Sequence, residues 1–395
     1  MGLILVANPG SSSRKYALYK HGEFQLEQIA AINIETSDKG LICTVHKDKN
    51  GGQTLPIDFT NVAESALHTE QIMRSAGVLN ENEQLDAIAI RIVAPGGYFM
   101  ADHVVDDEFM QKFILAQELA PIHIKNTLHE LDLLRQAHPQ IKTIGISDSS
   151  FHSTKPSYAW NYGIKLQDAD EYDIKRFGYH GLSVQASIDN LWSMGKLPPK
   201  VIVCHLGSGS SITAVFHGRS LDTTMGYSPL EGVLMATRSG TIDPIAVKIL
   251  RAKLNLDEDQ MEEYLNHQSG LLGIGGSNDI RELVEREANG DHLAHLALTT
   301  LVHTYHKAIG GMIAALGGAD MLVFTGTVGE RSAILRKRIV AHLGFAEFLL
   351  DTSTNAACLN PEKPTFISKM AQSKPIIVIP ANESLQIAKK ASALL

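Results

Sequence analysis

Two stretches of the chain, "ILVANPGSSSRKYALYKHG" (residues 4–22) and "VIVCHLGSGSSITAVFHG" (residues 201–218), decide how the fold is interpreted. Both show an apolar run, a turn of Gly and Ser, a second apolar run and then His-Gly. Each pattern predicts two strands joined by a tight turn. Because it recurs about 200 residues later, it indicates two related domains. Chance is the alternative, since hairpins in general share such turns.

The composition limits the classes of function. A chain of 395 residues is long enough for two domains, and 44% hydrophobic with 20% charged residues is typical of a soluble globular protein. The net charge of −8 argues against nucleic acid or an anionic membrane surface as the main partner. No apolar run reaches the roughly 18 residues of a membrane span. Three cysteines without paired spacing predict neither a disulfide framework nor a zinc site, and favour a cytoplasmic location.

Short apolar runs alternate with longer helical patterns along the rest of the chain, which predicts an α/β fold. The runs that we interpret as buried strands are 87–93, 142–148, 200–207, 320–326 and 375–381. The patterns that we interpret as helices are 106–120, 126–138, 293–316 and 330–344. The strongly apolar helix at 293–316 is expected to pack in a core.

The Gly/Ser turns of the two hairpins have a composition that suits an oxyanion. Glycine lets backbone N–H groups approach an anion closely, while serine hydroxyls and the neighbouring Arg14 or Lys15 would add donors and charge. Neither turn is a Walker A loop, and each alone is equally a plain hairpin connection. A matched pair, with a third Gly-rich turn at 324–331, favours a split phosphate or nucleotide site.

Five charged or titratable residues stand beside the predicted strand ends and turns. Arg91 lies inside an apolar strand, Asp148 ends another, and His180 stands between glycines. Arg238 precedes Ser-Gly, and Glu383 follows the last strand. A structural ion pair, helix or turn caps and a solvated arginine are the alternatives. Two cations, an imidazole and two carboxylates near phosphate-binding turns suit phosphoryl transfer, in which negative charge spreads over the equatorial oxygens.

At these residues the sequence resembles the acetate kinase family, within the acetate and sugar kinase/actin superfamily. The motifs that carry the resemblance are "NPGSSSRKY" (8–16), "SDSSFHSTKP" (147–156), "RFGYHGLS" (176–183), "CHLGSGSS" (204–211), "DTTMGYSPLEGVLMATRSGTIDP" (222–244), "SGLLGIGGSNDIRE" (269–282) and "VIPANES" (378–384). They extend over almost the whole chain. The resemblance implies two α/β domains of duplicated actin-like, ribonuclease H-like topology with a cleft between them. Residues 1–150 with 384–395 would form the acyl side and residues 151–383 the nucleotide side, in a homodimer.

The activity that the resemblance implies is reversible, Mg²⁺-dependent (or Mn²⁺-dependent) transfer of a phosphoryl group from ATP to acetate, giving acetyl phosphate and ADP. The implied catalytic residues are Arg91, Asp148, His180 and Arg238, and Asn8 and Glu383 would hold the metal. The acyl group would contact Arg91, Val93, Ile122, Tyr179 and Pro229. The nucleotide and its phosphates would contact Ser12, Lys15, His205, Gly207, Ser208, Gly209, Asp279, Arg281, Thr327, Gly329 and Arg331.

The sequence departs from the family pattern at the adenosine turn. The family commonly has T-A-G-I-G-E-N where this chain has Thr325 to Arg331, so that Thr327 replaces a glycine and Arg331 an amide. A β-branched side chain and a long cation narrow the space for a nucleoside, so pyrophosphate is the alternative donor. Propionate is the alternative acid, because one methylene changes binding by only about 1–3 kcal/mol. A catalytically silent sensor and a sugar kinase are further alternatives, the latter disfavoured by the apolar acyl lining.

Overall fold

The computed structural model describes residues 2–9, 13–22, 25–37, 40–48, 51–119, 121–369 and 371–395. These residues divide into two compact units, which we describe separately. Unit 1 comprises residues 1–150 and 382–395, and unit 2 comprises residues 151–381.

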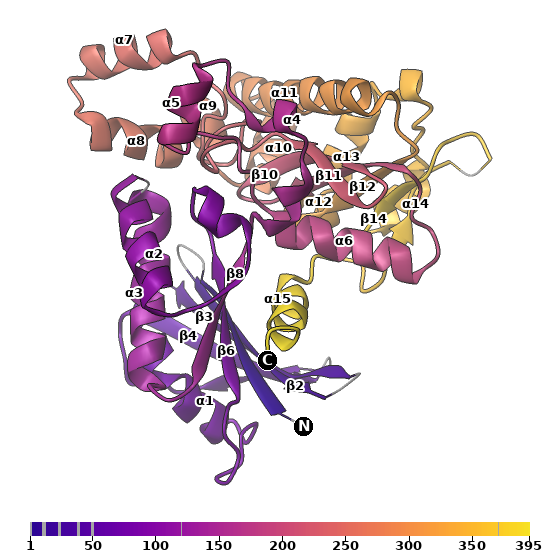
Figure 1. Ribbon diagram of the computed structural model, residues 1–395. Helices are drawn as coiled ribbons and strands as arrows, with labels where there is room; N and C mark the ends of the chain where they lie inside the picture. The colour runs from indigo at the N-terminus through magenta and orange to yellow at the C-terminus, as the bar shows by residue number, and fades with distance from the viewer. Residues whose placement is uncertain are drawn as a thin grey trace. The chain divides into compact units, whose positions relative to one another are not determined.

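Unit 1 is built on a sheet of eight strands with helices on both faces (Figure 1). Its strands are β1 (Gly2–Pro9), β2 (Ser13–His21), β3 (Leu26–Ser37), β4 (Gly40–Asp48), β5 (Gly51–Leu55), β6 (Ala87–Ile92), β7 (His103–Val104) and β8 (Lys142–Ser147). Its helices are η1 (Val62–His68), α1 (Thr69–Ser75), η2 (Gly97–Met100), α2 (Asp107–Leu119), α3 (Pro121–Ala137) and α15 (Glu383–Ser392). A short helix, η3 (Ser150–Thr154), begins at the last residue of this part of the unit.

The strand order of the unit 1 sheet is β5-β4-β3-β2-β1-β6-β8-β7. β1, β2 and β3 pair antiparallel, whereas β1, β6 and β8 run parallel. Alternate side chains of β1, Leu3 and Leu5 among them, join one core with α2 and α3, while Ile4 and Val6 are buried on the face that α15 covers (Figure 1). The side chains of β6 alternate in the same way, which places Arg91 on the α15 face.

Unit 2 contains a sheet of six strands and most of the helices of the described residues (Figure 1). Its strands are β9 (Lys200–Leu206), β10 (Ser210–Phe216), β11 (Arg219–Thr223), β12 (Met321–Thr325), β13 (Thr365–Phe366) and β14 (Ile376–Val378). Its helices are α4 (Ser157–Trp160), α5 (Leu166–Glu171), α6 (Gly181–Ser193), α7 (Pro244–Leu254), α8 (Glu258–His267), α9 (Gly270–Gly275), α10 (Ile280–Ala288), α11 (His292–Leu316), α12 (Gly326–Arg331), α13 (Ala333–Val340), η4 (Gly344–Ala346) and α14 (Thr352–Ala357).

The β9 strand shows why this sheet is buried on both faces. Ile202, Cys204 and Leu206 pack in the core that α11 covers, and the alternate residues Val201 and Val203 pack in the core on the α6 side. A strand buried on both faces has a continuous apolar sequence, as "VIVC" (201–204) does. The adjacent strands β12 and β14 alternate between the same two cores.

The two sheets repeat one topology. In unit 2 the strand order is β11-β10-β9-β12-β14-β13, with β9, β10 and β11 antiparallel and β9, β12 and β14 parallel. The central order β3-β2-β1-β6-β8 of unit 1 therefore corresponds to β11-β10-β9-β12-β14 of unit 2. The repeated sequence pattern forms the β1–β2 and β9–β10 hairpins at equivalent places. The predicted α/β fold of duplicated topology is confirmed.

Most predicted elements occur within a few residues of their expected bounds, but the region after β12 differs. The predicted helix at 330–344 is wrong in its bounds: α12 ends at Arg331, and α13 starts after Ser332, whose hydroxyl accepts from the Leu335 N–H at 3.3 Å. The predicted Gly-rich turn at 324–331 is instead the end of β12 followed directly by α12. Gly326 makes this abrupt change with a φ of 81°, and a Cβ there would lie 2.7 Å from the Leu206 carbonyl oxygen.

Helix α11 has the core position that its apolar sequence predicts. Its buried residues recur every three or four positions from Ala294 to Leu316 and pack on β9 and β10. Asp291 caps its start by accepting from two backbone N–H groups, and Gly317 ends it with a φ of 62°. Among the described helices, none has both the length and the apolar character that crossing a bilayer requires.

Candidate active site

In unit 1 the candidate residues come from the carboxyl ends of neighbouring strands. Asn8 is near the end of β1, Arg91 is in β6, and Asp148 directly follows β8. Lys15 of β2 is paired directly with Asn8, so their side chains share a face of the sheet. Glu383 is the first residue of α15, which packs on β1 and β6. Parallel strands bring their carboxyl ends to one edge, which is where α/β folds bind ligands.

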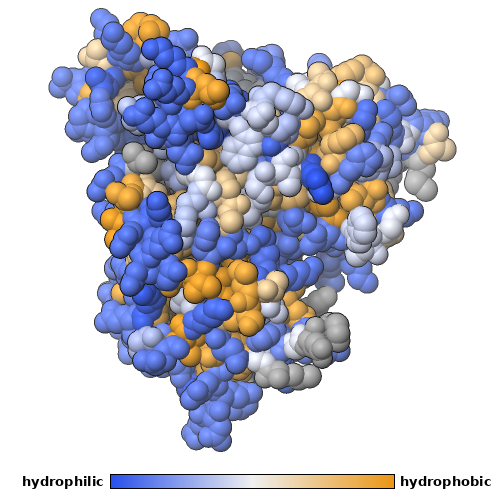
Figure 2. Space-filling model, viewed as in Figure 1, coloured by the Kyte–Doolittle hydropathy of each residue, from blue (hydrophilic) through white to orange (hydrophobic). Residues whose placement is uncertain are grey.

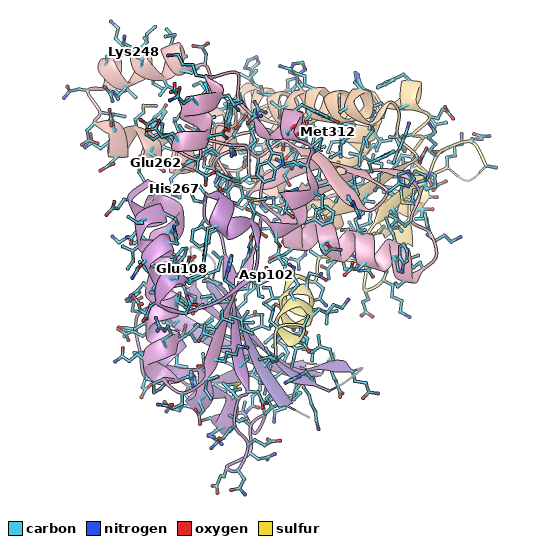
Figure 3. The ribbon with its side chains drawn as sticks, in the orientation of Figure 1. Asp102, Glu108, Lys248, Glu262, His267 and Met312 are labelled. Carbon is cyan, nitrogen blue, oxygen red and sulfur yellow. The ribbon has the colours of Figure 1, made fainter. Side chains whose placement is uncertain are left out.

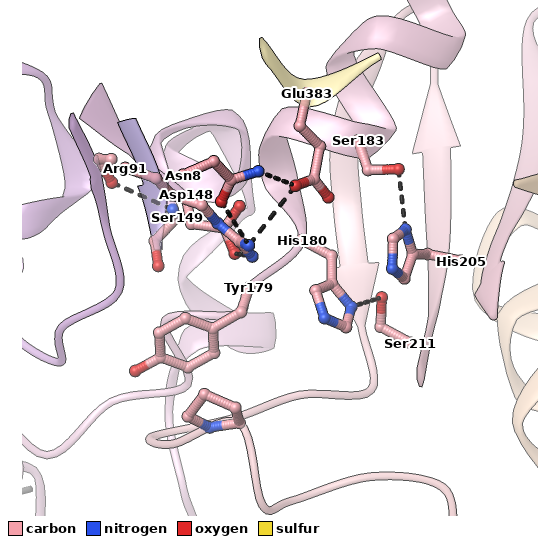
Figure 4. Close-up of polar contacts among 12 residues, drawn as sticks. Asn8, Arg91, Asp148, Ser149, Tyr179, His180, Ser183, His205, Ser211 and Glu383 are labelled. Atoms are coloured by element: carbon pink, nitrogen blue, oxygen red, sulfur yellow. Dashed lines mark hydrogen bonds and ion pairs between the residues drawn. The ribbon is translucent and has the colours of Figure 1, made fainter. Parts of the chain in front are cut away.

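The Arg91 guanidinium is the centre of this cluster (Figure 4). Its Nη2 lies 2.8 Å from Asp148 Oδ2, and its Nη1 lies 3.5 Å from both Glu383 Oε2 and Asn8 Oδ1. The Asn8 amide also donates to Glu383 Oε2 at 2.9 Å. The structural ion pair that was the alternative for Arg91 thus exists, and its partners are other candidate site residues.

Burial and charge act in opposite directions on Arg91. Burial lowers the pKa of this guanidinium, but the carboxylates of Asp148 and Glu383 raise it by more, so the pKa is raised overall. The side chain of Asp148 is fully buried and that of Arg91 is 18% exposed. A permanently charged group is therefore fixed in direction, as electrostatic stabilisation of an anion requires.

Arg14 does not share the environment of Lys15. Its side chain points into the core, where Nε lies 2.6 Å from Oε2 of the fully buried Glu130, and Tyr16 also donates to Glu130. Lys15, the alternate residue of β2, is exposed. The expectation that Arg14 contributes to the phosphate loop is therefore not supported, because alternation along the strand turns it inward.

Three further candidate residues belong to unit 1: Ser12, Ile122 and Val93. Ser12 lies outside the described residues, and so does the side chain of Ile122, whose backbone belongs to α3. Val93 follows β6 directly and is half-buried.

In unit 2, two histidines are oriented by serine hydroxyls (Figure 4). His180 Nδ1 lies 3.0 Å from Ser211 Oγ, and His205 Nδ1 lies 2.8 Å from Ser183 Oγ. The two imidazole rings are 4.1 Å apart between centroids. His180 has a left-handed φ of 60° and immediately precedes α6, so the backbone turns sharply at this residue.

Arg238 and His180 meet beside Gly209 in the β9–β10 turn. A Cβ at Gly209 would lie 3.1 Å from Arg238 Nη1 and 3.3 Å from His180 Nε2. Arg238 Nη1 also lies 3.4 Å from the carbonyl oxygen of Pro229, which is buried. The structure thus brings four candidate residues together, and glycine keeps the space between the cation and the imidazole open.

Tyr179 is held from two directions. Its hydroxyl donates to the Tyr227 carbonyl at 2.6 Å, and its own carbonyl oxygen lies 3.0 Å from Nε2 of His152. His152 is fully buried, and its Nδ1 lies 2.9 Å from Ser220 Oγ. Burial lowers the pKa of His152 to about 3, so this histidine is neutral and structural at physiological pH.

A cavity of about 630 Å³ lies wholly within unit 2. Its apolar lining includes residues of α10, α11, α12 and α13, and the lining also includes six of the candidate nucleotide residues: Gly207, Ser208, Asp279, Arg281, Thr327 and Arg331. Among the described residues, His205, Gly209 and Gly329 are candidates that do not line it. Gly329 packs instead against Leu206 and Phe324, because its helix α12 turns this position toward β9 and β12.

Asp279 and Arg281 form one polar corner of the cavity. Asp279 caps α10 by accepting from the Arg281 N–H at 2.8 Å, and its Oδ2 lies 2.6 Å from Arg281 Nη2. The hydrogen bond from Arg281 holds the pKa of Asp279 below its usual value. Arg331 is exposed and donates to Asn360 Oδ1 at 3.1 Å. The cavity lining therefore contains two exposed guanidinium groups, those of Arg281 and Arg331.

Sequence reasoning missed the residues that orient the candidates. Ser183, Ser211 and His152 lie within motifs that the sequence singled out, so proximity to His180 and to the second hairpin was the available signal. Glu231 lies in the 222–244 motif, but Tyr162, whose hydroxyl accepts from the Tyr227 N–H and donates to Glu231, lies outside every motif and had no signal of this kind.

A duplicated actin-like fold with polar side chains at equivalent strand ends, fixed arginines and a cavity of nucleotide size defines the class: a phosphotransferase of the acetate and sugar kinase/actin superfamily.

Comparison with known proteins narrows the class to a family. The family model of the Acetokinase family matches residues 3–389. An acetate kinase of Carboxydothermus hydrogenoformans is 36% identical over 98% of both chains. Among solved structures, Porphyromonas gingivalis acetate kinase has a TM-score of 0.85 at 29% identity over the full length of both chains. A propionate kinase of Francisella tularensis has a TM-score of 0.87 at 32% identity over 99% of both chains. The chain belongs to the acetokinase family, whose members are phosphotransferases acting on a carboxyl group.

Proposed function

We propose that this chain catalyses reversible transfer of the γ-phosphoryl group of ATP to acetate, giving acetyl phosphate and ADP. The observation that carries the proposal is the fixed guanidinium of Arg91, held 2.8 Å from a fully buried carboxylate at the carboxyl ends of parallel strands. Family membership and the nucleotide-sized cavity of unit 2 support it.

The chemistry needs no side-chain nucleophile, because acetate is already an anion. A carboxylate oxygen of acetate attacks the γ-phosphorus in line, a new O–P bond forms, and the bond to the bridging oxygen of ADP breaks with its electron pair moving to ADP. Arg91 and Arg238 bind the carboxylate and the transferring phosphoryl group, and His180 donates a hydrogen bond to an equatorial oxygen. Fixed cations act here because they stabilise charge that spreads in the transition state.

The donor set of unit 1 fits Mg²⁺. Asn8, Asp148 and Glu383 offer amide and carboxylate oxygens, the hard ligands that this ion prefers. Mg²⁺ usually binds through one or two carboxylates together with waters and substrate phosphates, so few protein ligands are needed. When bound, the ion would neutralise phosphate charge; Asn8 and Glu383 would hold it, with Asp148 orienting Arg91.

The test is formation of acyl phosphate, trapped as the hydroxamate, with C2 to C4 acids and with ATP, GTP or pyrophosphate as donor. We expect the highest kcat/KM with acetate, ATP and Mg²⁺. Inactivity with every donor would refute the kinase and favour a silent sensor. Arg238→Ala should abolish turnover while leaving the thermal unfolding temperature unchanged, and near-wild-type turnover in this variant would refute its role.

Propionate is the second candidate acid, because a propionate kinase is among the similar solved structures. The candidate acyl residues Val93, Tyr179 and Pro229 are apolar or aromatic, and a pocket of this kind separates acids that differ by one methylene by only about 10- to 200-fold. A higher kcat/KM with propionate than with acetate would assign the longer acid.

We also propose that the chain pairs with a second copy in the cytoplasm. Helix α7 supports this, since none of its residues is buried and its Ile245 and Ile249, one turn apart, are 61% and 56% exposed. Figure 2 shows apolar patches on the otherwise hydrophilic surface of the α7–α8 region. Lys248 lies on the same helix, and Glu262 lies on α8 (Figure 3). Ile245→Asp with Ile249→Asp should yield monomers in light scattering, and an unchanged dimer mass would refute this surface.

A further inference from the structure

The segment 226–232 joins the candidate residues of unit 2 without belonging to a helix or strand. The backbone of Tyr227 is held at both of its polar groups. Its N–H donates to Tyr162 Oη at 2.9 Å, and its carbonyl oxygen accepts from Tyr179 Oη at 2.6 Å. Two residues further on is Pro229, whose carbonyl oxygen accepts from Arg238 at 3.4 Å. One irregular segment therefore connects Tyr179 with Arg238.

The holding side chain, Tyr162, is itself fixed by a closed set of contacts. Its hydroxyl donates to Glu231 Oε2, and Glu231 Oε1 lies 3.3 Å from Arg176 Nη2. The Arg176 guanidinium in turn lies over the Tyr162 ring, 4.7 Å from its centroid. Each of the three side chains thus contacts the other two, so none can move without breaking two interactions.

Glycine at position 226 makes room for this arrangement. A Cβ there would lie 1.7 Å from Glu231 Oε2 and 2.4 Å from Tyr162 Oη, so a larger residue would push this hydroxyl–carboxylate pair out of place. The Gly226 carbonyl also accepts from the Gly178 N–H at 3.1 Å, next to Tyr179. The hydroxyl–carboxylate pair therefore occupies the space beside the backbone that precedes Tyr227.

We infer that Tyr162 and Glu231, braced by Arg176, are positioning residues that hold segment 226–232 and so set the acyl-side placement of Pro229 and Tyr179, which selects the length of the carboxylic acid. The inference rests on the proposed function. Neither residue touches the reacting atoms; they act through Tyr227. Loss of the support loosens the acid pocket and leaves the nucleotide cavity unchanged, because neither residue lines that cavity among the described residues.

The test is Tyr162→Phe, which keeps the ring under Arg176 and removes the hydroxyl. We expect the KM for acetate to rise about ten-fold, since the Tyr227 N–H and a Glu231 oxygen lose a partner. The ratio of kcat/KM for acetate to that for propionate should fall, and the KM for ATP should change by less than roughly two-fold. Tyr158→Phe is the matched control: Tyr158 is 78% exposed and should leave all three values unchanged.

Glu231→Gln is the second variant, and it removes the ion pair with Arg176 while keeping the size of the side chain. It should shift the acetate KM in the same direction by a smaller factor. Equal increases in the KM for acetate and ATP, or an unchanged acetate KM in both variants, would overturn the inference.

Amide hydrogen exchange at Tyr227 gives a readout that does not depend on turnover. We expect faster exchange in Tyr162→Phe than in wild type or Tyr158→Phe, because the donor loses its acceptor. A wild-type protein that phosphorylates no acid would refute the proposed function alone. Unchanged exchange at Tyr227 in Tyr162→Phe would overturn the positioning role whatever the activity.

Discussion

Replacing Arg336 should lower the free energy of unfolding of unit 2 far more than replacing an exposed cation beside it. Arg336 is the largest fully buried side chain among the described residues, and none of their carboxylates forms an ion pair with it. Its five N–H groups instead donate to neutral oxygens. The acceptors are Asn355 Oδ1 at 2.8 Å and the carbonyls of Gly329 (2.7 Å), Glu330 (3.0 Å), Asn355 (3.0 Å) and Cys358 (2.5 Å).

These acceptors explain how a lone charge can be buried. The carbonyls of Gly329 and Glu330 belong to the last turn of α12, and those of Asn355 and Cys358 end α14. Helix C-termini carry partial negative charge and carbonyls without intrahelical partners, so one guanidinium satisfies two helix ends. Burial lowers the pKa of Arg336, and the five oxygen acceptors around the guanidinium stabilise its charged form.

The expected magnitude follows from what a substitution would leave behind. Arg336→Met preserves the stem but takes a donor away from five buried oxygens. The carbonyls of Glu330 and Asn355 keep the N–H groups of Asn360 and Cys358 as donors, so three oxygens are orphaned, at about 1–3 kcal/mol each and not additively. We expect unit 2 to lose about 4 kcal/mol. Arg336→Lys offers at most three donors in place of five, so roughly half of that loss should remain.

Urea unfolding followed by tryptophan fluorescence measures the free energy of unfolding of unit 2, because the two tryptophans, Trp160 and Trp192, both lie in that unit. Lys337→Met is the matched control, since the neighbouring Lys337 is exposed. Helix α12 also lines the nucleotide cavity, so the KM for ATP should rise in Arg336→Lys. A Met variant within about 1 kcal/mol of wild type would refute the account of two helix ends held by one charge.

Three further predictions concern the candidate site of unit 2. Gly209→Ala places a methyl group between Arg238 and His180 and should lower kcat about 100-fold at unchanged stability. Gly163→Ala is the control, because no atom lies within 4 Å of a Cβ there, and it should keep the wild-type kcat. Equal kcat values in the two variants would contradict the geometry. Burial lowers the pKa of His152 from 6.5 to about 3. Between these two pH values the imidazole is therefore protonated in the unfolded chain and neutral in the folded chain. The free energy of unfolding of unit 2 should therefore fall by up to about 1.4 kcal/mol per pH unit as the pH is lowered from 6.5 to about 3. Urea titrations at several pH values should show this slope in the wild type and not in His152→Gln. Arg331→Asn should lower the KM for ATP without changing that for acetate, and a rise would show that the cation binds the donor.

The fold was predictable because its decisive signals are local. Alternating apolar runs around two Gly/Ser turns indicated the β1–β2 and β9–β10 hairpins, and their repetition indicated the duplicated topology. Side-chain direction in a hairpin needs the register, however. The sequence left Arg14 and Lys15 equivalent, and only the pairing of Asn8 with Lys15 and the burial of Glu130 separate them.

The candidate site was predictable where a residue type is unusual for its place, as with a charged Arg91 inside an apolar strand. It was not predictable where the chemistry depends on contacts between distant segments. Tyr162 and Glu231 meet 69 residues apart, and Arg336 reaches 22 residues ahead to Cys358. Such contacts depend on how loops and short helices pack on the sheets, which periodicity does not encode.

The duplicated strands show how one scaffold supports two different kinds of surface. In the repeated hairpins His205 takes the place of Asn8, and its partner Ser211 takes the place of Lys15. Thr325, which pairs with His205, takes the place of Arg91, one residue beyond the Ala7–Ile90 pair. In unit 1 these places hold a fixed charge with carboxylate partners. In unit 2 they hold an imidazole and two hydroxyl side chains, and Thr325 Oγ1 is buried without a partner among the described residues.

The chain takes different paths after β6 and after β12. In unit 1 the backbone continues past β6 through a loop to η2, whereas in unit 2 Gly326 turns at once into α12, whose Thr327 and Arg331 line the cavity. A Cβ at Gly326 would lie 2.7 Å from the Leu206 carbonyl oxygen, so glycine at this position permits the direct change from β12 to α12. The same strand end can therefore fix a cation or start a cavity-lining helix, and each unit does one of the two.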